Sequence, residues 1–294
     1  MEFLSLYCTF SSDFSFIEYT FSSDFFKTTL RLSCYSLGMN RNSETEATVL
    51  ALKQIGEQNR LVTLFTPKDG VITAVLYGGP KSKLRAMVSP YHRGRIWLYT
   101  DTVRKSCKIS DFDVQNFRPG IRESLFKTWA ASLCSELVIK TYAQGESTYK
   151  LVQGFLDGLD IAQEQQAKLG LLRFLWRYQC ELGLQYNTAT CIQCGALLSG
   201  FKSEEQAVPL QSGGGFLCPD CCKNAGKDTV LMNSVSIEGI LYLQAIENAT
   251  PQEVRMLKIS QGTFSSLQGF LFERTNKTTE NRLKTLETSS LIFR

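Results

Sequence analysis

The segment RLVTLFTPKDGVITAVLY, residues 60–77, indicates the fold of the first half of this sequence. It holds two short runs rich in Val, Leu, Ile and Thr on either side of Pro67-Lys68-Asp69-Gly70, a sequence typical of the turn in a β-hairpin. Similar runs lie at residues 47–54, 95–100 and 108–117. Five strands with no helix between them predict a small closed barrel of the OB or SH3 kind.

Positive charge is concentrated in the same part of the chain. Residues 39–118 hold 13 Lys or Arg and 7 Asp or Glu, a net charge of +6, whereas residues 1–38 carry −2 and residues 119–294 are neutral. We therefore expect the barrel to bind a polyanion, and nucleic acid in particular. The candidate DNA-binding residues are Arg60, Lys68, Lys81, Lys83, Arg85, Arg93, Arg95 and Arg104.

Aromatic residues accompany these cations. Proteins that bind single strands combine cations that follow the phosphates with rings that stack on the bases. The candidate rings are Tyr77, Tyr91, Trp97, Tyr99 and Phe117, and for each of them packing in the barrel core is the alternative.

From residue 121 onward the spacing of apolar residues becomes helical. A first helix is expected to bury a face made of Leu125, Trp129, Leu133, Leu137 and Ile139. A second, over residues 163–184, is apolar on most sides and is typical of the centre of a bundle. Further helices are expected near 234–246 and 260–274, followed by a frayed polar tail whose last residues, 291–294, could dock.

Two CxxC pairs, Cys191-Ile-Gln-Cys194-Gly195 and Cys218-Pro-Asp-Cys221, predict a metal site in the helical half. Two residues between thiolates allow a tight turn to direct both sulfurs at one ion, and two such turns complete a closed tetrahedron. Gly195 supplies a residue that can take positive φ. We therefore predict one structural Zn²⁺ held by Cys191, Cys194, Cys218 and Cys221.

Alternatives remain open for these cysteines. Cys222 could replace Cys221 as the fourth ligand, the second CxxC taken alone resembles a thioredoxin-type redox motif, and two disulfides are a further alternative. The remaining cysteines lack the spacing of a disulfide framework, so we expect a reducing, cytoplasmic compartment.

Catalytic motifs are missing from the sequence. No Walker, GxGxxG, HExxH or GxSxG pattern occurs, and His92 is the single histidine, so we expect a protein that is not an enzyme. No apolar run is long enough for a transmembrane helix, so no membrane partner is expected.

Residues 1–38 differ in composition from the rest, with Phe, Ser and Asp recurring in FSSDFSF and FSSDFF. Because Met39 follows directly, we hypothesise that Met39 is the native start. A short functional extension is the alternative.

Several of these features together resemble the bacterial RecO recombination mediators. They are RLVTLFT (60–66) followed by Gly70, the glycine-led basic loop GGPKSKL (78–84), and LLRFLWRYQCELGL (171–184) followed by the two CxxC pairs. The resemblance covers roughly residues 45–275. Gly79-Pro80 departs from the pattern, because members often carry more arginines in this loop.

The resemblance implies an α+β multidomain fold: a five-stranded OB-type barrel over 39–118, then a helical domain over 119–294 with a zinc-binding insertion at 188–225. It also implies binding of single- and double-stranded DNA, annealing of complementary strands, and loading of RecA together with RecR in the cytoplasm, at the nucleoid.

The resemblance further implies that the C-terminal tail of single-strand-binding protein docks on the helical domain. Arg173 and Arg177, four residues apart on one helix, are candidates to bind its acidic end, and a surface salt bridge is the alternative. Two other functions remain open: a zinc-ribbon nucleic-acid module acting in transcription or on RNA, and a CxxC thiol redox protein.

Overall fold

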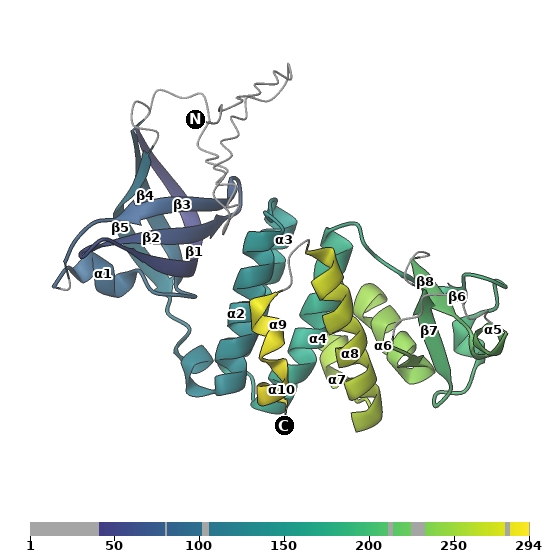
Figure 1. The fold of residues 1–294 in the computed structure, drawn as a ribbon. Helices are drawn as coiled ribbons and strands as arrows, with labels where there is room; N and C mark the ends of the chain where they lie inside the picture. Colours follow the sequence, from purple (N-terminus) through teal and green to yellow (C-terminus); the bar gives the residue numbers. More distant parts are fainter. Residues whose placement is uncertain are drawn as a thin grey trace, which may run out of the picture.

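The computed structural model describes residues 41–79, 81–101, 106–210, 214–224, 233–279 and 283–293. A β-barrel lies at one end, helices occupy the middle, and a small four-stranded sheet lies at the other end (Figure 1). The predicted fold class, a five-stranded barrel followed by a helical region that carries a cysteine cluster, is confirmed. The hypothesis on residues 1–38 falls outside the described residues, as does the candidate Arg104, and the predicted domain boundaries stay predictions.

The barrel is of the OB type. Its strands are β1 (Asn42–Ile55), β2 (Asn59–Thr66), β3 (Gly70–Leu76), β4 (Arg93–Asp101) and β5 (Ser106–Asn116). They are paired in the order β1-β2-β3-β5-β4, and β1 pairs with β4 to close the barrel. A short helix, α1 (Lys83–Met87), connects β3 to β4, so the expectation of no helix in this region was wrong. Five residues are too few to show a helical period in the sequence.

Alternation along the strands divides the barrel residues into two sets. Val62 and Leu64 on β2, for example, lie in the barrel interior with Ile72 and Ala74 of β3. Phe65 points outward and is nevertheless fully buried, because it packs in the hydrophobic core of the helices. One side of the barrel is therefore covered by the helical region.

The helical region begins with a 3₁₀ turn, η1 (Pro119–Glu123), and is centred on one helix. The α-helices are α2 (Leu125–Lys140), α3 (Glu146–Ile161), α4 (Glu164–Glu181), α6 (Ile237–Asn248), α7 (Pro251–Met256), α8 (Gln261–Thr278), α9 (Lys284–Glu287) and α10 (Ser289–Ile292). α4 packs against α2, α3, α6 and α8, as expected for the central helix of a bundle. None of the helices in the described part of the chain is long and apolar enough to cross a bilayer.

Two helical expectations need correction. Leu125 was expected on the buried face of its helix, but it is 74% exposed because it is the first residue of α2, ahead of the turns that pack. α3 was not predicted, although Tyr149, Val152, Leu156 and Leu159 give it a buried face at helical spacing.

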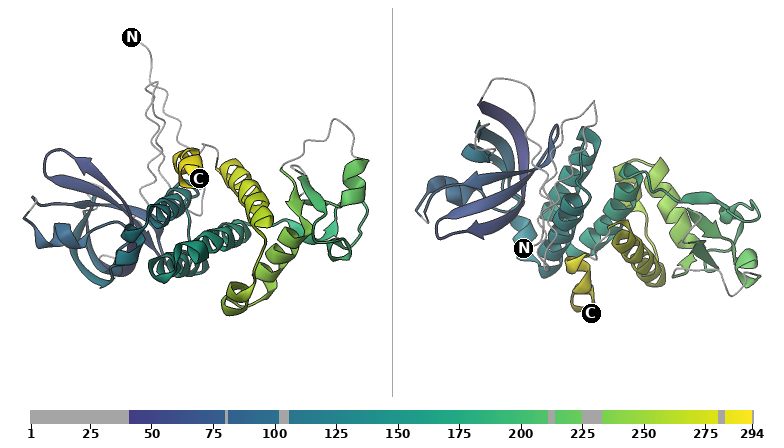
Figure 2. Two further views of the ribbon diagram at one scale, coloured as in Figure 1. Left: turned by 90° about the horizontal axis from the view of Figure 1, so that it is seen from below. Right: turned by 45° about the horizontal axis from the view of Figure 1, so that its top comes forward.

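A small sheet lies at the far end of the helices (Figure 2), and the four predicted ligand cysteines lie on it or beside it. Its strands are β6 (Asn187–Cys191), β8 (Gly215–Leu217), β7 (Gln206–Leu210) and β9 (Val235–Ser236), in that order. A 3₁₀ turn, η2 (Leu198–Gly200), follows β6, and α5 (Pro219–Lys223) follows β8. Residues 211–213 lie outside the described residues, so the expected glycine loop tip is described only from Gly214, whose φ is +64°.

The C-terminal residues pack on the bundle, so the expectation of a frayed tail was wrong and that of a docked end was right. Glu136 of α2 accepts hydrogen bonds from the backbone N–H groups of Lys284 (2.9 Å) and Thr285 (2.8 Å). The ring of Phe293 then lies 5.6 Å from that of Phe126 and 5.5 Å from that of Trp129.

We predict that Phe293→Ala lowers the free energy of unfolding by about 2 kcal/mol, because a half-buried ring loses several aromatic contacts. Leu291→Ala, at a position that is 60% exposed, is the matched control and should change it by less than about 0.5 kcal/mol. Urea unfolding followed by circular dichroism measures both. An effect of Phe293→Ala as small as that expected for the control would show that the contacts of this ring add no stability.

Candidate metal centre and nucleic-acid interface

The four predicted cysteines meet at one point beside the small sheet. Cys191 ends β6, Cys194 lies in the following turn, Cys218 is the N-cap of α5, and Cys221 lies within α5. Their sulfur atoms all lie within 4.8 Å of one another, and those of Cys194 and Cys218 are 3.8 Å apart. A tetrahedral ion with metal–sulfur bonds of about 2.3 Å would separate its sulfurs by about 3.8 Å. The cluster therefore has the dimensions of a closed, four-coordinate metal site.

Backbone geometry supports this arrangement. Gly195 has a φ of +75°, as predicted, and its N–H donates to the carbonyl of Cys191 (2.9 Å). The N–H of Cys218 donates to the sulfur of Cys191 (3.2 Å), and that of Cys221 donates to the sulfur of Cys218 (3.4 Å). Donors directed at sulfur favour the thiolate form, which is the form that binds metals.

Protonation in the cluster is uneven. Burial raises the pKa of Cys191, but the N–H groups of Cys194, Cys218 and Gln193 outweigh it and lower this pKa to about 6. The neighbouring thiol of Cys194, through its hydrogen bond, raises the pKa of Cys221 above its ordinary value, and burial adds to the effect. One thiolate therefore forms readily and opposes the formation of others, unless a cation compensates their charge.

Cys222 does not join the cluster. Its sulfur is not among the four that converge, because consecutive residues of a helix such as α5 point about 100° apart. The geometry therefore favours Cys221 over Cys222 as the fourth sulfur.

We predict that the purified, reduced protein holds one metal ion per chain, that Cys218→Ser loses it, and that Cys222→Ser keeps it. Elemental analysis measures the metal content of each variant, and a colorimetric chelator measures its release. Retention by Cys218→Ser, or loss only from Cys222→Ser, would contradict the assignment of the four sulfurs.

Three of the predicted DNA-binding arginines have partners within the protein. Arg93 forms an ion pair with Glu46, and Arg95 forms one with Glu44 (3.2 Å). Arg85 donates through Nη1 to the carbonyls of Gln58 (2.7 Å) and Gly78 (3.0 Å), and so joins two loops of the barrel. Internal contacts occupy these groups, and their role in binding stays a prediction.

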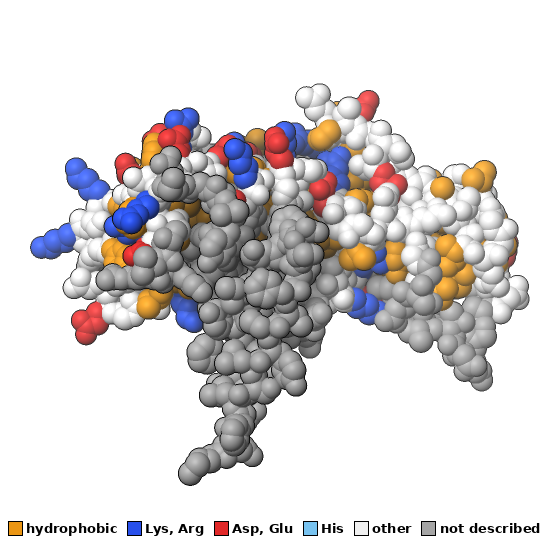
Figure 3. Space-filling model, turned by 90° about the horizontal axis from the view of Figure 1, so that it is seen from above, with side chains coloured by type: hydrophobic (Ala, Val, Ile, Leu, Met, Phe, Trp, Pro, Cys, Tyr) orange, Lys and Arg blue, Asp and Glu red, His pale blue; other side chains and the backbone are white. Residues whose placement is uncertain are grey.

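The other predicted cations differ in their surroundings. Arg60 is half-exposed and Lys81 and Lys83 are exposed, and none of them forms an ion pair with a described residue. Lys68 is in the turn between β2 and β3, two residues before Gly70, which lies against the α2–α3 loop. Figure 3 shows basic side chains scattered around the barrel, with acidic ones among them.

Pairing across the strands brings together a row of residues that was not predicted from the sequence. Lys53 of β1 pairs with Leu61 of β2, Leu61 with Val75 of β3, Val75 with Lys108 of β5, and Lys108 with Tyr99 of β4. We call these five residues the outer row. Both lysines are exposed, the other three are half-exposed, and each has at least one neighbour along its strand that belongs to the barrel core or packs against it. Strand alternation could have placed each residue outside, but only the register brings them together.

Two features suit the outer row to a single strand of nucleic acid. Adjacent strands lie about 4.8 Å apart, so the row runs roughly 14 Å around the curved wall of the barrel from Lys53 to Lys108, with Leu61 and Val75 between them. The ammonium group of Lys108 lies over the ring of Tyr99, 4.6 Å from its centroid. The row thus combines cations for phosphates with apolar and aromatic surface for bases.

The structure also sorts the candidate aromatic rings. Tyr91 is buried, and its hydroxyl lies 3.0 Å from that of Ser132, so for this ring the alternative of core packing holds. Trp97 and Tyr99 are half-exposed, and Tyr77 and Phe117 are 54% and 45% exposed.

The two arginines predicted to bind a partner lie close together on α4. Arg173 donates to the hydroxyl of Tyr242 (3.1 Å), and Arg177 donates to the carbonyl of Ile246 (3.2 Å). Burial, followed by the charges of Arg173 and Arg255, lowers the pKa of Arg177. Neither forms a salt bridge with any residue in the described ranges, so the salt-bridge alternative is not observed there.

Known proteins resemble the chain over most of its length. The family model for the N-terminal part of recombination protein O matches residues 39–114, and that for the C-terminal part matches residues 122–287. A DNA repair protein RecO from Syntrophotalea carbinolica is 29% identical over 67% of this chain and 75% of its own length. Its counterpart from Myxococcus xanthus is 28% identical over 72% and 86%. Another, from Alkaliphilus metalliredigens, is 24% identical over 78% and 90%. The chain therefore belongs to the recombination protein O family.

Proposed function

We propose that the protein is a non-enzymatic mediator of recombinational DNA repair. In this proposal it binds single- and double-stranded DNA, anneals complementary strands and, together with RecR, helps load RecA. The observation that supports it most directly is the outer row on an OB-type barrel, in a chain whose relatives are named DNA repair proteins. Such an activity places the protein in the cytoplasm, at the nucleoid.

The chemistry of the outer row fits binding without sequence preference. Lys53 and Lys108 offer point charges to phosphates, while Leu61 and Val75 offer apolar contacts that do not distinguish bases. The β2–β3 face of OB barrels is where such proteins bind oligonucleotides, and the outer row crosses this face. A strand held in this way keeps its base edges available for pairing with a complementary strand.

The direct test is annealing of complementary strands coated with single-strand-binding protein. We expect the purified protein to accelerate annealing in a salt-dependent manner. A well-folded sample that neither binds single-stranded DNA nor accelerates annealing would reject the proposal. Stronger binding to RNA than to DNA would favour the zinc-ribbon alternative.

We predict that Lys53→Ala/Lys108→Ala weakens binding of single-stranded DNA by about tenfold and lowers the slope of log affinity against log salt by about 1.4, since each lost phosphate contact removes about 0.7. Fluorescence anisotropy at several salt concentrations measures both. Lys223→Ala/Lys277→Ala removes the same charge at two exposed, ion-paired positions and is the control. Equal losses in the two double variants would show that net charge, not the outer row, binds DNA.

We further propose that the ion in the cysteine cluster is Zn²⁺ with a structural role. Four thiolates form a closed set with no position left for a substrate, and they suit a soft ion that prefers tetrahedral geometry. Through the bound ion, Cys191 and Cys218 would connect β6 to the start of α5. The ion would thereby stabilise the small sheet at the end of the bundle.

The arginines on α4 are proposed to bind the acidic C-terminal tail of single-strand-binding protein. Arg173 and Arg177 are half-buried, and Arg255 on α7 adds a third positive charge close enough to act on Arg177. Met256, next in sequence, is 81% exposed and offers apolar surface beside the charges. The carboxylates of an acidic peptide would form charge-assisted hydrogen bonds with these three arginines.

We predict that Arg255→Glu weakens binding of a peptide with the sequence of that tail by about tenfold, because it reverses an exposed charge within the cluster. Lys258→Glu, an equal charge reversal at an exposed position three residues further on, should change binding less than about twofold. Anisotropy of a labelled peptide measures both. Equal effects would assign binding to general electrostatic attraction.

A further inference from the structure

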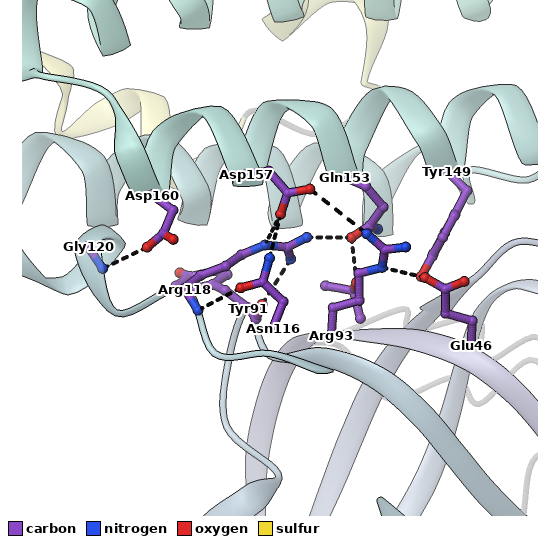
Figure 4. Close-up of polar contacts among 11 residues, drawn as sticks. Glu46, Tyr91, Arg93, Asn116, Arg118, Gly120, Tyr149, Gln153, Asp157 and Asp160 are labelled. Carbon is purple, nitrogen blue, oxygen red and sulfur yellow. Dashed lines mark hydrogen bonds and ion pairs between the residues drawn. The ribbon is translucent and has the colours of Figure 1, made fainter. Parts of the chain in front are cut away.

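We propose that Arg118 is a positioning residue that holds the barrel and α3 together as one rigid body. Arg118 lies in the segment between the two regions that match the family models, which end at residue 114 and begin again at residue 122. It touches neither the outer row nor the cysteine cluster. Its contacts instead cross from the barrel to the helices (Figure 4).

Arg118 is completely buried, which is rare for an arginine unless its charge and donors are satisfied. Nε donates to Oδ1 of Asp157 (2.8 Å), and Nη2 donates to Oε1 of Gln153 (2.7 Å), both on α3. Nη1 donates to the carbonyl of Tyr91, which lies just before β4 (2.9 Å). One guanidinium therefore binds the barrel side and the helix side at the same time.

The acceptors on α3 are themselves tied to the barrel. Oε1 of Gln153 also accepts from the hydroxyl of Thr48 on β1 (2.8 Å). Oδ1 of Asp157 accepts from Nδ2 of Asn116, at the end of β5 (2.9 Å). Three elements of the barrel are thus joined to two side chains of α3: β1 and β5 directly, and the loop before β4 through Arg118.

We call the polar contacts of Arg118, Gln153 and Asp157 between the barrel and α3 the seam. A second set of polar contacts extends the seam along α3. Arg93 of β4 forms an ion pair with Glu46 of β1, and its Nη1 lies 3.9 Å from Oδ2 of Asp157. The hydroxyl of Tyr149, on α3, donates to Glu46 (3.4 Å), and its ring lies 5.3 Å from that of Phe65. Polar and apolar contacts therefore run side by side across the same junction.

The chain that connects the two parts has little freedom to act as a hinge. Arg118 takes a left-handed conformation, with φ 47° and ψ 56°. The N–H of Gly120 donates to Oδ1 of Asp160 (2.7 Å), and a Cβ at Gly120 would lie 2.1 Å from the carbonyl oxygen of Asp160. This connection lies directly against the C-terminal part of α3.

Opening the seam would separate a buried cation from its acceptors, which is strongly unfavourable. The guanidinium is also matched to this site by shape, since its planar fork reaches three acceptors in different directions, whereas a lysine would reach fewer. The angle between the barrel, with its outer row, and the helices is therefore fixed by this side chain.

The test compares Arg118→Met with Lys150→Met. Lys150 is exposed and its ion pair is with Glu146 of the same helix, so its variant loses the same charge without losing a contact across the junction. Spin labels on genetically encoded ketone side chains at Ser110 of β5 and Ser265 of α8, both exposed, avoid the ten cysteines. Double electron–electron resonance then measures the distance distribution between the two labels in the full chain, without nucleic acid.

We expect one narrow distribution in the wild type and in Lys150→Met, and a distribution about twice as wide in Arg118→Met. Arg118→Lys should give an intermediate width, because an ammonium group can retain part of the contacts. A folded Arg118→Met with the width of the wild type would overturn the proposal.

Arg118→Met could fail to fold, and circular dichroism detects that outcome. Gln153→Leu and Asp157→Leu then each remove one acceptor and leave Arg118 in place, and both are expected to widen the distribution. Wild-type widths in both variants would overturn the proposal. This readout does not involve DNA, so a failure of the wild type to bind DNA would reject the proposed function without deciding the role of Arg118.

Discussion

The guanidinium of Arg118 is buried between the barrel and α3, with donors directed at groups of both. Because those contacts cross the junction, the outward face of the barrel is divided in two. One side, with Leu50 and Phe65, is covered by the helices and shares their core. The remaining outward face, with Lys53 and Lys108, is free of that packing. The position of the proposed DNA-binding row is thus a consequence of how the barrel is attached.

The cysteine cluster stands apart from this junction, at the opposite end of the helices (Figure 1). Its sulfurs close around one point and leave no open position, which favours stabilisation of a local fold over chemistry on a substrate. Three proposed sites therefore lie apart along the protein: DNA contacts on the barrel, a peptide site on α4, and a metal site beside the small sheet beyond it.

Much of this arrangement could be predicted from the sequence, where the physical constraint is local. The CxxC spacing placed four sulfurs together because each pair needs only one turn, and Gly195 took the positive φ that its turn requires. Alternation in residues 60–77 likewise gave two strands and their turn. The features that escaped prediction depend on contacts between distant residues. Arg118 follows a strand and precedes Pro119-Gly120, a context typical of an ordinary loop, and only the position of α3 makes it a buried link. In the same way, the sequence does not show that Tyr91 is buried, because the helices that cover it lie far from it in the chain.

Hydrogen–deuterium exchange of the full chain, with and without a single-stranded oligonucleotide, tests most directly whether the outer row binds DNA while the barrel stays fixed on the helices. We expect slower exchange in peptides of β1, β2, β3 and β5 that contain Lys53, Leu61, Val75 and Lys108, with exchange around Arg118 and Gln153 already slow and unchanged by DNA. Protection confined to the cysteine segment, or new protection at the Arg118 seam without any at the outer row, would contradict this view of the protein.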